Sequence, residues 1–370
     1  MKRYDVIVLG GGIIGCATAE ELARRGAAVC LIEREAIGDE ASKAAAGILS
    51  AQMDIDEPSP FLDLCQESHR LYPGWVRRIE RSARMSVGYH VDGILYVAYT
   101  QGAIRQKTAQ SRWQQRRGLR VERWSSRDVL RQEPNLEPGV KAGFFFPKEA
   151  QVDNVKLMDA LAAAVRNAGV TVLEHTLALR LLTNGEKVAG VRTNYQEVRA
   201  PVVVNCLGSW AGLGRMLSPH PVVVPARGQM LSFQAPGRFF RRAVMSDDAY
   251  GVQRRDGQLL VGSTVEFVGF DKHVTLQGME RILAGFRNMV RPEALARCIF
   301  QEAWAGLRPC SIDRLPILGA GSIPGLFVAI GHFRHGILLA PMTAKLIAEL
   351  IFHQHPSFDP APFSPQRFVR

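Results

Sequence analysis

The sequence lacks the cysteine patterns that hold metals or carry out thiol redox chemistry. It has six cysteines in 370 residues, and no two of them form a C-x-x-C pair. We therefore expect neither a zinc ribbon nor a thioredoxin-like centre, and we predict no metal site. Scattered cysteines suit a reducing, cytoplasmic setting, in which Cys16 and Cys30 act as small core residues.

Long hydrophobic runs are missing too. The longest late one, residues 336–352, is interrupted by Lys345 and Glu349 and is too polar for a transmembrane helix. Lys2 and Arg3 precede a short apolar run, but three glycines break it, so we expect folded protein rather than a signal peptide. With 47% apolar residues and no internal repeat, the chain is long enough for about two domains.

Acidic residues are fewer than basic ones, 35 against 46. The excess is concentrated between Arg105 and Arg131, where the arginine spacing suggests one helix face, although Gly118 weakens a continuous helix. The arginines in question are Arg112, Arg116, Arg120, Arg123 and Arg127. We expect a solvated face, and the alternative is a surface for RNA or anionic lipid.

The opening of the chain carries the strongest pattern. A buried strand is followed by Gly10-x-Gly12-x-x-Gly15, a helix, and a second strand that ends on Glu33. This order is the dinucleotide-binding fingerprint, in which Gly10 makes the turn, Gly12 admits a pyrophosphate and Gly15 lets the helix pack closely. The helix N-terminus attracts phosphate, and the acid accepts hydrogen bonds from a ribose.

Two kinds of strand alternate along the rest of the chain. Buried, parallel-type strands return at 170–173, 201–208 and 326–330, whereas antiparallel signals fill the intervals, including a hairpin at Asp256-Gly257. We therefore predict an α/β fold, α+β overall, with two domains. Residues 1–87, 148–218 and 307–370 form the Rossmann-like one, and residues 88–147 and 219–306 form the other.

Three shorter segments are predicted less directly. A second antiparallel insertion into the Rossmann-like domain starts near Pro219, and within it Val222–Val224 and Gln229–Phe233 each have the composition of a strand. The proline-rich tail from His353 to Arg370 is expected to run extended over the surface.

Several motifs together resemble the flavin-dependent D-amino-acid oxidase family, and within it the glycine oxidases of thiamine biosynthesis. They are Gly10-x-Gly12-x-x-Gly15, Glu33, the 42–49 segment, Asn205–Trp210, Trp304–Pro309 and Gly331–Pro341. The resemblance implies an FAD-binding domain of the glutathione-reductase type and a substrate domain with a large antiparallel β-sheet. It implies non-covalent FAD, and Cys310 does not stand where a covalent link is expected.

The resemblance also assigns the cofactor contacts. Gly12, Ile13, Ile14, Glu33 and Arg34 would bind the adenosine half, together with backbone near Ala178. Ala41 and Ser42 would lie near the phosphates, and Ala46, Gly47 and Ile48 beside the flavin ring. The turn Gly331–Leu338, with His332, Phe333, Arg334, His335, Gly336 and Ile337, would wrap the pyrimidine edge. There a helix dipole, with Arg334 and His335, would favour negative charge on the reduced flavin.

Substrate binding is assigned in the same way. Arg308 would hold a carboxylate through two parallel hydrogen bonds, Tyr250 would add a third, and Arg334 would be a second arginine of the pocket. The amine would bind neutral, a hydride would pass from Cα to flavin N5, and an imine would form. Oxygen would then reoxidise the flavin and give hydrogen peroxide.

The identity of the amine and of the electron acceptor stays open. Val265, Asp248 and Ala249 depart from the expected pattern, which leaves glycine, sarcosine, N-ethylglycine and small D-amino acids as substrates. One alternative function is a membrane-peripheral dehydrogenase of D-amino acids or proline. Another is a flavin-dependent oxidase for tRNA modification, with nucleic acid bound by the basic stretch. A homo-oligomer is expected from the resemblance alone.

Overall fold

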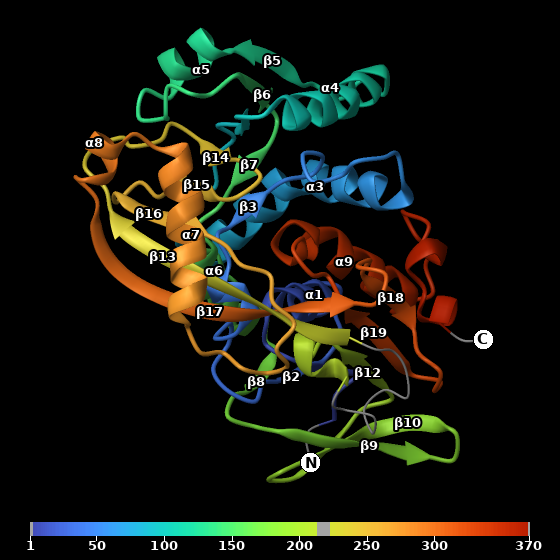
Figure 1. The fold of residues 1–370 in the computed structure, drawn as a ribbon. Coiled ribbons are helices and arrows are strands. Elements are labelled where there is room, and N and C mark those ends of the chain that lie inside the picture. Colours follow the sequence, from blue (N-terminus) through green and yellow to red (C-terminus); the bar gives the residue numbers. More distant parts are fainter. Residues whose placement is uncertain (1–2, 213–222, 369–370) are drawn as a thin grey trace.

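Two β-sheets organise the chain. A computed structural model describes residues 3–212 and 223–368, and Figure 1 shows α4 and α5 at one end of the molecule and the β9–β10 hairpin at the other. The predicted start of an insertion near Pro219 and the predicted strand residue Val222 lie outside the described residues. The fold is mixed α/β, with one largely parallel and one largely antiparallel sheet, as the sequence predicts.

The first sheet has six strands in the order β18-β19-β12-β1-β2-β8. Its strands are β18 (Ile317–Ala320), β19 (Leu326–Ile330), β12 (Val202–Asn205), β1 (Val6–Leu9), β2 (Val29–Ile32) and β8 (Thr171–Leu173). All pairings are parallel except that of β18 with β19. Strands far apart in sequence thus end at one edge of the sheet, as predicted for the fingerprint region.

Helices pack beside this sheet and form its hydrophobic core together with it. They are α1 (Ile13–Arg24), α3 (Pro60–Ala83), α6 (Asn154–Asn167) and α9 (Gly336–Ile351). Helix α1 packs on α9 and α6, and α3 packs on α9 and α6. Helix α3 begins where Ser59 Oγ accepts a hydrogen bond from Leu62 N with Pro60 in the first turn, and it ends at Arg84 in the left-handed conformation.

The second sheet has eight strands in the order β17-β13-β16-β15-β14-β4-β6-β5. They are β17 (Ile299–Ser311), β13 (Val223–Gln234), β16 (Gln258–Gly262), β15 (Tyr250–Gln253), β14 (Ala243–Met245), β4 (Ile94–Ala98), β6 (Ala142–Phe146) and β5 (Glu122–Ser125). The β15–β16 hairpin at Asp256-Gly257 is confirmed. The strands predicted at 222–224 and 229–233 are confirmed for residues 223–224 and 229–233, but they are not separate, because β13 runs on through Pro225 and Gly228 while pairing with β17.

The basic stretch is not one helix face. Helix α4 (Gln101–Arg116) ends before Gly118, which has φ +76°, and Arg123 lies on β5 before the short helix α5 (Ser126–Gln132) begins. The prediction of a shared face for Arg112–Arg127 is therefore wrong. Gly118 ends the helix because a left-handed residue suits a helix C-terminus.

Smaller elements complete the fold. They are α2 (Ala41–Ala44), α7 (Leu276–Met289), α8 (Pro292–Leu295), the pair β3 (Ile48–Leu49) with β7 (Ala150–Gln151), and the 3₁₀ turns Gly208–Gly212, Ala361–Phe363 and Pro365–Phe368. The three-stranded sheet β9 (Ala178–Asn184), β10 (Lys187–Thr193) and β11 (Glu197–Arg199) was not predicted. The tail is not merely extended, since it forms 3₁₀ turns and buries Phe363 in the core.

No helix within residues 3–212 and 223–368 is long and apolar enough to cross a membrane. This agrees with the interruption of the last apolar run by Lys345 and Glu349, both of which lie on α9.

Candidate active site

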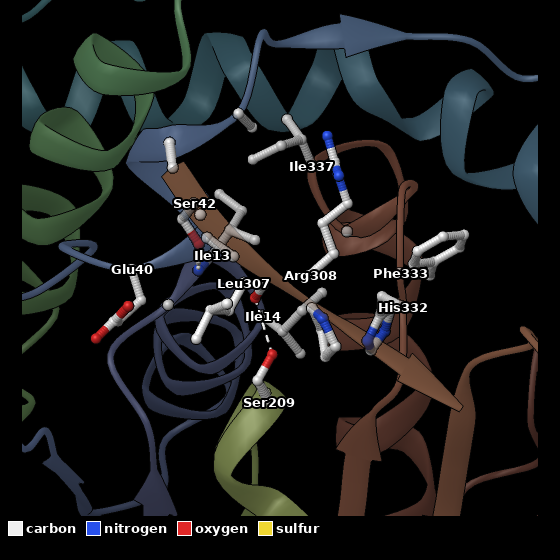
Figure 2. Close-up of a pocket in the computed structure, with 18 of the residues that line it drawn as sticks. Ile13, Ile14, Glu40, Ser42, Ser209, Leu307, Arg308, His332, Phe333 and Ile337 are labelled. Atoms are coloured by element: carbon white, nitrogen blue, oxygen red, sulfur yellow. Dashed lines mark hydrogen bonds between the residues drawn. The ribbon is translucent and has the colours of Figure 1, made fainter. Parts of the chain in front are cut away.

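A cavity of about 610 Å³ lies at the carboxyl ends of β1, β2, β12 and β19. Figure 2 shows Ile13, Ile14 and Ser42 on one side of it, with Arg308, His332 and Phe333 on the other. Strands β13, β15 and β17 of the second sheet also supply lining residues. The cavity therefore joins the two sheets, at the edge where parallel α/β sheets bind ligands.

Nearly all the predicted site residues line this one cavity. They are Gly10, Gly12, Ile13, Ile14, Glu33, Arg34, Ala41, Ser42, Ala46, Gly47, Ile48, Ala178, Tyr250, Arg308, His332, Phe333, Arg334, His335, Gly336, Ile337 and Leu338. Gly15 does not line it. Instead, a Cβ at Gly15 would lie 1.8 Å from Gly10 O, so the missing side chain lets α1 pack against the turn, which itself has φ +100° at Gly10.

The N-terminus of α1 is set up by two polar side chains. Glu33 accepts hydrogen bonds from Gly11 N at 2.5 Å and from Glu35 N at 2.9 Å, which fixes its carboxylate at the end of β2. Ser42 Oγ accepts from Ile13 N at 2.9 Å. Gly12 is the N-cap and offers no capping side chain. The first turn of α1 thus faces the cavity next to one hydroxyl group.

Small residues form the wall between α2 and β3. Ala41, Ala44, Ala45, Ala46 and Gly47 all line the cavity, so backbone is close to whatever fills it. Strand β17 packs against this wall, because a Cβ on Gly306 would lie 2.6 Å from Ala44 Cβ and Trp304 Nε1 donates to Ala44 O at 3.0 Å. A flat, bulky group fits such a surface better than a small polar one.

The turn after β19 brings two histidines to the cavity. His332 Nε2 lies 3.0 Å from Thr343 Oγ1, whereas His335 Nε2 is buried without a hydrogen-bond partner in the described structure. Burial lowers the pKa of His332 to about 3 and that of His335 to about 4. The expectation that His335 adds positive charge here is therefore wrong, because both rings are neutral near pH 7.

Arg308 lies on β17 of the second sheet, opposite Ala226 on the neighbouring strand β13. Its Nη1 donates to Thr264 O at 3.0 Å and its Nη2 to Ser263 Oγ at 2.8 Å. A Cβ at Gly228 would lie 2.0 Å from Nη1, so any side chain at this position of β13 would displace the guanidinium. Burial lowers the pKa of Arg308, while the nearby Tyr250 hydroxyl opposes that shift. The Arg308 guanidinium is therefore a cation that is largely shielded from solvent.

Tyr250 and Arg334 approach the same cavity from other elements. The Tyr250 hydroxyl donates to Met230 Sδ at 3.0 Å, and Arg334 Nη2 lies 3.2 Å from Asp54 Oδ2. Arg334 is therefore an ion-paired group rather than a free cation. Cys310 does not line the cavity, and its thiol lies 3.5 Å from Ser311 O.

Sequence reasoning missed several lining residues, among them Asp54, Trp210, Gly228, Met230, Met245 and Ser263. A signal existed for Gly228, because a glycine inside a strand often marks a close approach. Asp54 lies in a loop with no recognisable motif. Trp210 stacks under Arg34, 4.3 Å from its guanidinium carbon to the ring centre, and this pairing joins residues too distant in sequence to predict.

The family comparison agrees with this geometry. The family described as FAD dependent oxidoreductase, DAO, matches residues 5–350, which include the glycine turn, Arg308 and the turn after β19.

The chain belongs to the DAO family.

Proteins similar to this chain are named glycine oxidase or bifunctional protein ThiO/ThiG. The chain is 36% identical to the bifunctional protein ThiO/ThiG of Synechocystis sp. over 99% of its own length and 54% of that protein, so it spans about half the length of this relative. It is 32% identical to the glycine oxidase of Pseudomonas aeruginosa, covering 97% of this chain and 98% of that one. The crystal structure of glycine oxidase from Geobacillus kaustophilus matches with TM-score 0.95, 30% identity and full coverage of both chains.

The DAO family is described as FAD dependent oxidoreductase, and the cavity residues fit that cofactor. The α1 N-terminus is suited to a pyrophosphate, the Glu33 carboxylate to a ribose, and the small-residue wall to a flat ring. The unpartnered, buried His335 Nε2 is a polar atom that a bound group would satisfy. The parts of an FAD site are therefore present in one cavity.

Proposed function

We propose that this enzyme oxidises the amine of glycine, or of another small amino acid or secondary amine, with oxygen as the electron acceptor and hydrogen peroxide as a product. The observation that supports it most is Arg308, a sheltered cation whose side chain lines the same cavity as the small-residue wall. The names of the glycine oxidase relatives point to the same reaction. We also propose a role in thiamine biosynthesis, from the name ThiO/ThiG.

The carboxylate of the substrate is the group that Arg308 suits. Each terminal guanidinium nitrogen carries two hydrogens, and Thr264 O and Ser263 Oγ use one on each. The remaining hydrogens can go to a carboxylate, in the bidentate geometry that arginine favours. The Tyr250 hydroxyl donates to the weak acceptor Met230 Sδ and lies close to Arg308, so it can turn to the same carboxylate.

The remaining side chains orient the substrate and exclude water. Met230 and Met245 line the cavity near Tyr250, and their apolar surfaces keep the site dry. Bound FAD supplies the two-electron acceptor for oxidation of the C–N bond. Because His332 and His335 stay neutral, we propose that orientation by Arg308 and Tyr250, rather than a basic histidine, prepares the Cα–H bond.

The finer assignments belong to the same proposal. Glu33, Arg34 and Ala178 would contact the adenosine half, Ser42 the phosphates, and Gly47, Ile48 and 332–338 the flavin. We propose the division into FAD-binding and substrate-binding domains at the boundaries given above, although β17 runs through the boundary at 306/307. A cytoplasmic location and a homo-oligomer are proposed as well.

Hydrogen peroxide formation in air tests the proposal. Purified protein would be assayed with glycine, sarcosine, D-alanine and D-proline side by side, with catalase added as the control that removes the signal. We expect peroxide with at least one of them, and glycine first. Anaerobic bleaching of the flavin without peroxide in air would favour the dehydrogenase. No bleaching with any of the four would overturn the small-amine proposal and lead to the RNA alternative, which predicts salt-sensitive RNA binding.

A further inference from the structure

A second arginine, Arg254, lies behind the wall on which the flavin is expected to rest. It follows β15, the strand that carries Tyr250, and it is only 6% exposed. Its Nη1 donates to Val152 O at 2.6 Å, and its Nη2 donates to Ala46 O at 2.8 Å and to Asn154 Oδ1 at 2.7 Å. Its acceptors are thus two carbonyls and one amide.

Asn154 extends this contact along the wall. The side chain is 1% exposed, and its Nδ2 donates to Ser42 O at 2.9 Å and to Lys43 O at 2.8 Å. Arg254 and Asn154 together hold three carbonyls of the segment 42–46, and all residues of this segment except Lys43 line the cavity. The segment is also bound through its backbone, since Val152 N donates to Gly47 O at 2.9 Å.

Burial of the Arg254 cation costs desolvation free energy, and this cost calls for a physical explanation. Within residues 3–212 and 223–368, Arg254 forms no ion pair, and Asp153 and Asp256 act on it only at longer range. Burying a charge among neutral acceptors costs desolvation free energy, and a role for its geometry or its field would explain why the residue is placed here. By comparison, the sheltered Arg242 lies 3.3 Å from Glu133 and stacks over Trp124 and Phe145, on the outer strands of the second sheet.

We propose that Arg254 is a positioning residue of the flavin site. It holds Ala46 O directly, and through Asn154 the carbonyls of Ser42 and Lys43, against the hairpin that carries Tyr250. It also places a permanent positive charge behind the flavin wall. FAD affinity and the placement of the substrate-binding hairpin are thereby coupled through one side chain. The inference rests on the FAD site of the proposed function but not on which amine is oxidised.

Two properties of the holoenzyme test this proposal. The first is the FAD dissociation constant, measured by quenching of free flavin fluorescence. We expect Arg254→Met to raise it about tenfold or more, because hydrogen bonds to a charged group are lost. Asn154→Ala should raise it as well, and the two effects should not add, since both residues act on one segment. Arg242→Met, the matched control, should leave it within about twofold.

The second property is the midpoint potential of bound FAD. Reduction adds negative charge to the flavin, so losing the cation in Arg254→Met should make the potential more negative. Arg254→Lys should keep the potential near that of the wild type while FAD affinity falls, because a lysine retains the charge but cannot reach three acceptors. A purely structural residue would not separate the two readouts.

Each result has a clear meaning. Unchanged FAD affinity in Arg254→Met, or an equal loss in Arg242→Met, overturns the inference. So does a potential that shifts equally in the methionine and lysine variants. If Arg254→Met does not fold, Arg254→Lys and Asn154→Ala decide by the same criteria. Absence of FAD binding by the wild type would instead overturn the proposed function, so the two failures are distinguishable.

Discussion

The two walls of the cavity are built in different ways. The wall on the side of the first sheet comes from three short segments, 10–14, 41–48 and 332–338, and in 41–48 it consists largely of small residues. The wall from the second sheet is formed mainly by side chains on its strands, among them Arg308 on β17, Tyr250 on β15 and Met230 on β13. The first wall suits a large, invariant cofactor, and the second suits a small group recognised by charge.

This difference separates the expected effects of substitution. Changes in the first wall should act on FAD affinity and on folding, because backbone shape is what binds there. Changes in the second should act on substrate kinetics while the protein stays yellow, because a side chain can be removed without reshaping the sheet. Single substitutions in each wall test that separation.

Arg308→Ala should lower kcat/KM for the oxidised amine by about 10³-fold, because a buried, charge-assisted carboxylate contact is lost. The FAD content should stay at the wild-type value. Steady-state peroxide kinetics and the visible flavin spectrum would be measured on the same preparation. Arg308→Lys serves as the control and should retain part of the activity. Loss of the flavin together with the activity would contradict the separation of the two walls.

Gly15→Ala should instead weaken FAD binding and leave substrate binding unchanged. Its Cβ would lie 1.8 Å from Gly10 O, a backbone atom that cannot move without distorting the turn. Overpacking of this kind costs about 1–3 kcal/mol, so FAD affinity and thermal stability should both fall. Protein that retains FAD should keep its KM for the amine. The matched control is Gly139→Ala, because a Cβ at Gly139 has open space around it.

Gly228→Ala should raise KM about tenfold with little change in FAD affinity. The new methyl group would lie 2.0 Å from Arg308 Nη1, so the guanidinium must tilt away from the carboxylate position. The same Gly139→Ala variant controls for loss of backbone freedom. An unchanged KM would mean that Arg308 has room to move without loss of function.

In the apoprotein, the free energy of unfolding should fall less in His332→Gln than in the wild type when the pH drops from 7.5 to 6. The expected difference is about 1 kcal/mol. The folded protein keeps the pKa of His332 near 3, whereas an unfolded histidine titrates near 6.5. The unfolded state therefore gains a proton first, and stability falls as the pH drops from 7.5 to 6. The measurement is the urea midpoint at both pH values, and an equal fall in the variant would contradict the predicted pKa.

Local patterns predicted the glycine turn of the first wall and the acid beside it. Gly10, Gly12, Gly15 and Glu33 stand at fixed spacings because a strand, a turn and a helix are neighbours in the chain. The second wall depends on register between distant strands, such as Ala226 opposite Arg308 and Gly228 opposite Gly306. The sequence around residue 228 does not indicate which residue lies opposite it in the sheet. Only the family resemblance could therefore point to Arg308 and Tyr250.

Two errors have related causes. The continuous strand β13 contains Pro225 and Gly228, which local rules assign to a break, yet pairing with the long β17 carries the strand through both. The charge expected on His335 depended on its surroundings, and Phe61 packs edge-on against its ring, 5.0 Å away between centres. Burial is a tertiary property and cannot be taken from the residue type.

Titration of bound FAD with acetate tests the central claim most directly. Acetate has a carboxylate but no amine to oxidise, so it reports only whether a carboxylate site lies beside the flavin. The wild type should show a saturable change in the flavin absorbance spectrum, and Arg308→Ala, with FAD still bound, should show none. The same spectral change with the same dissociation constant in both proteins would contradict the assignment of the carboxylate to Arg308.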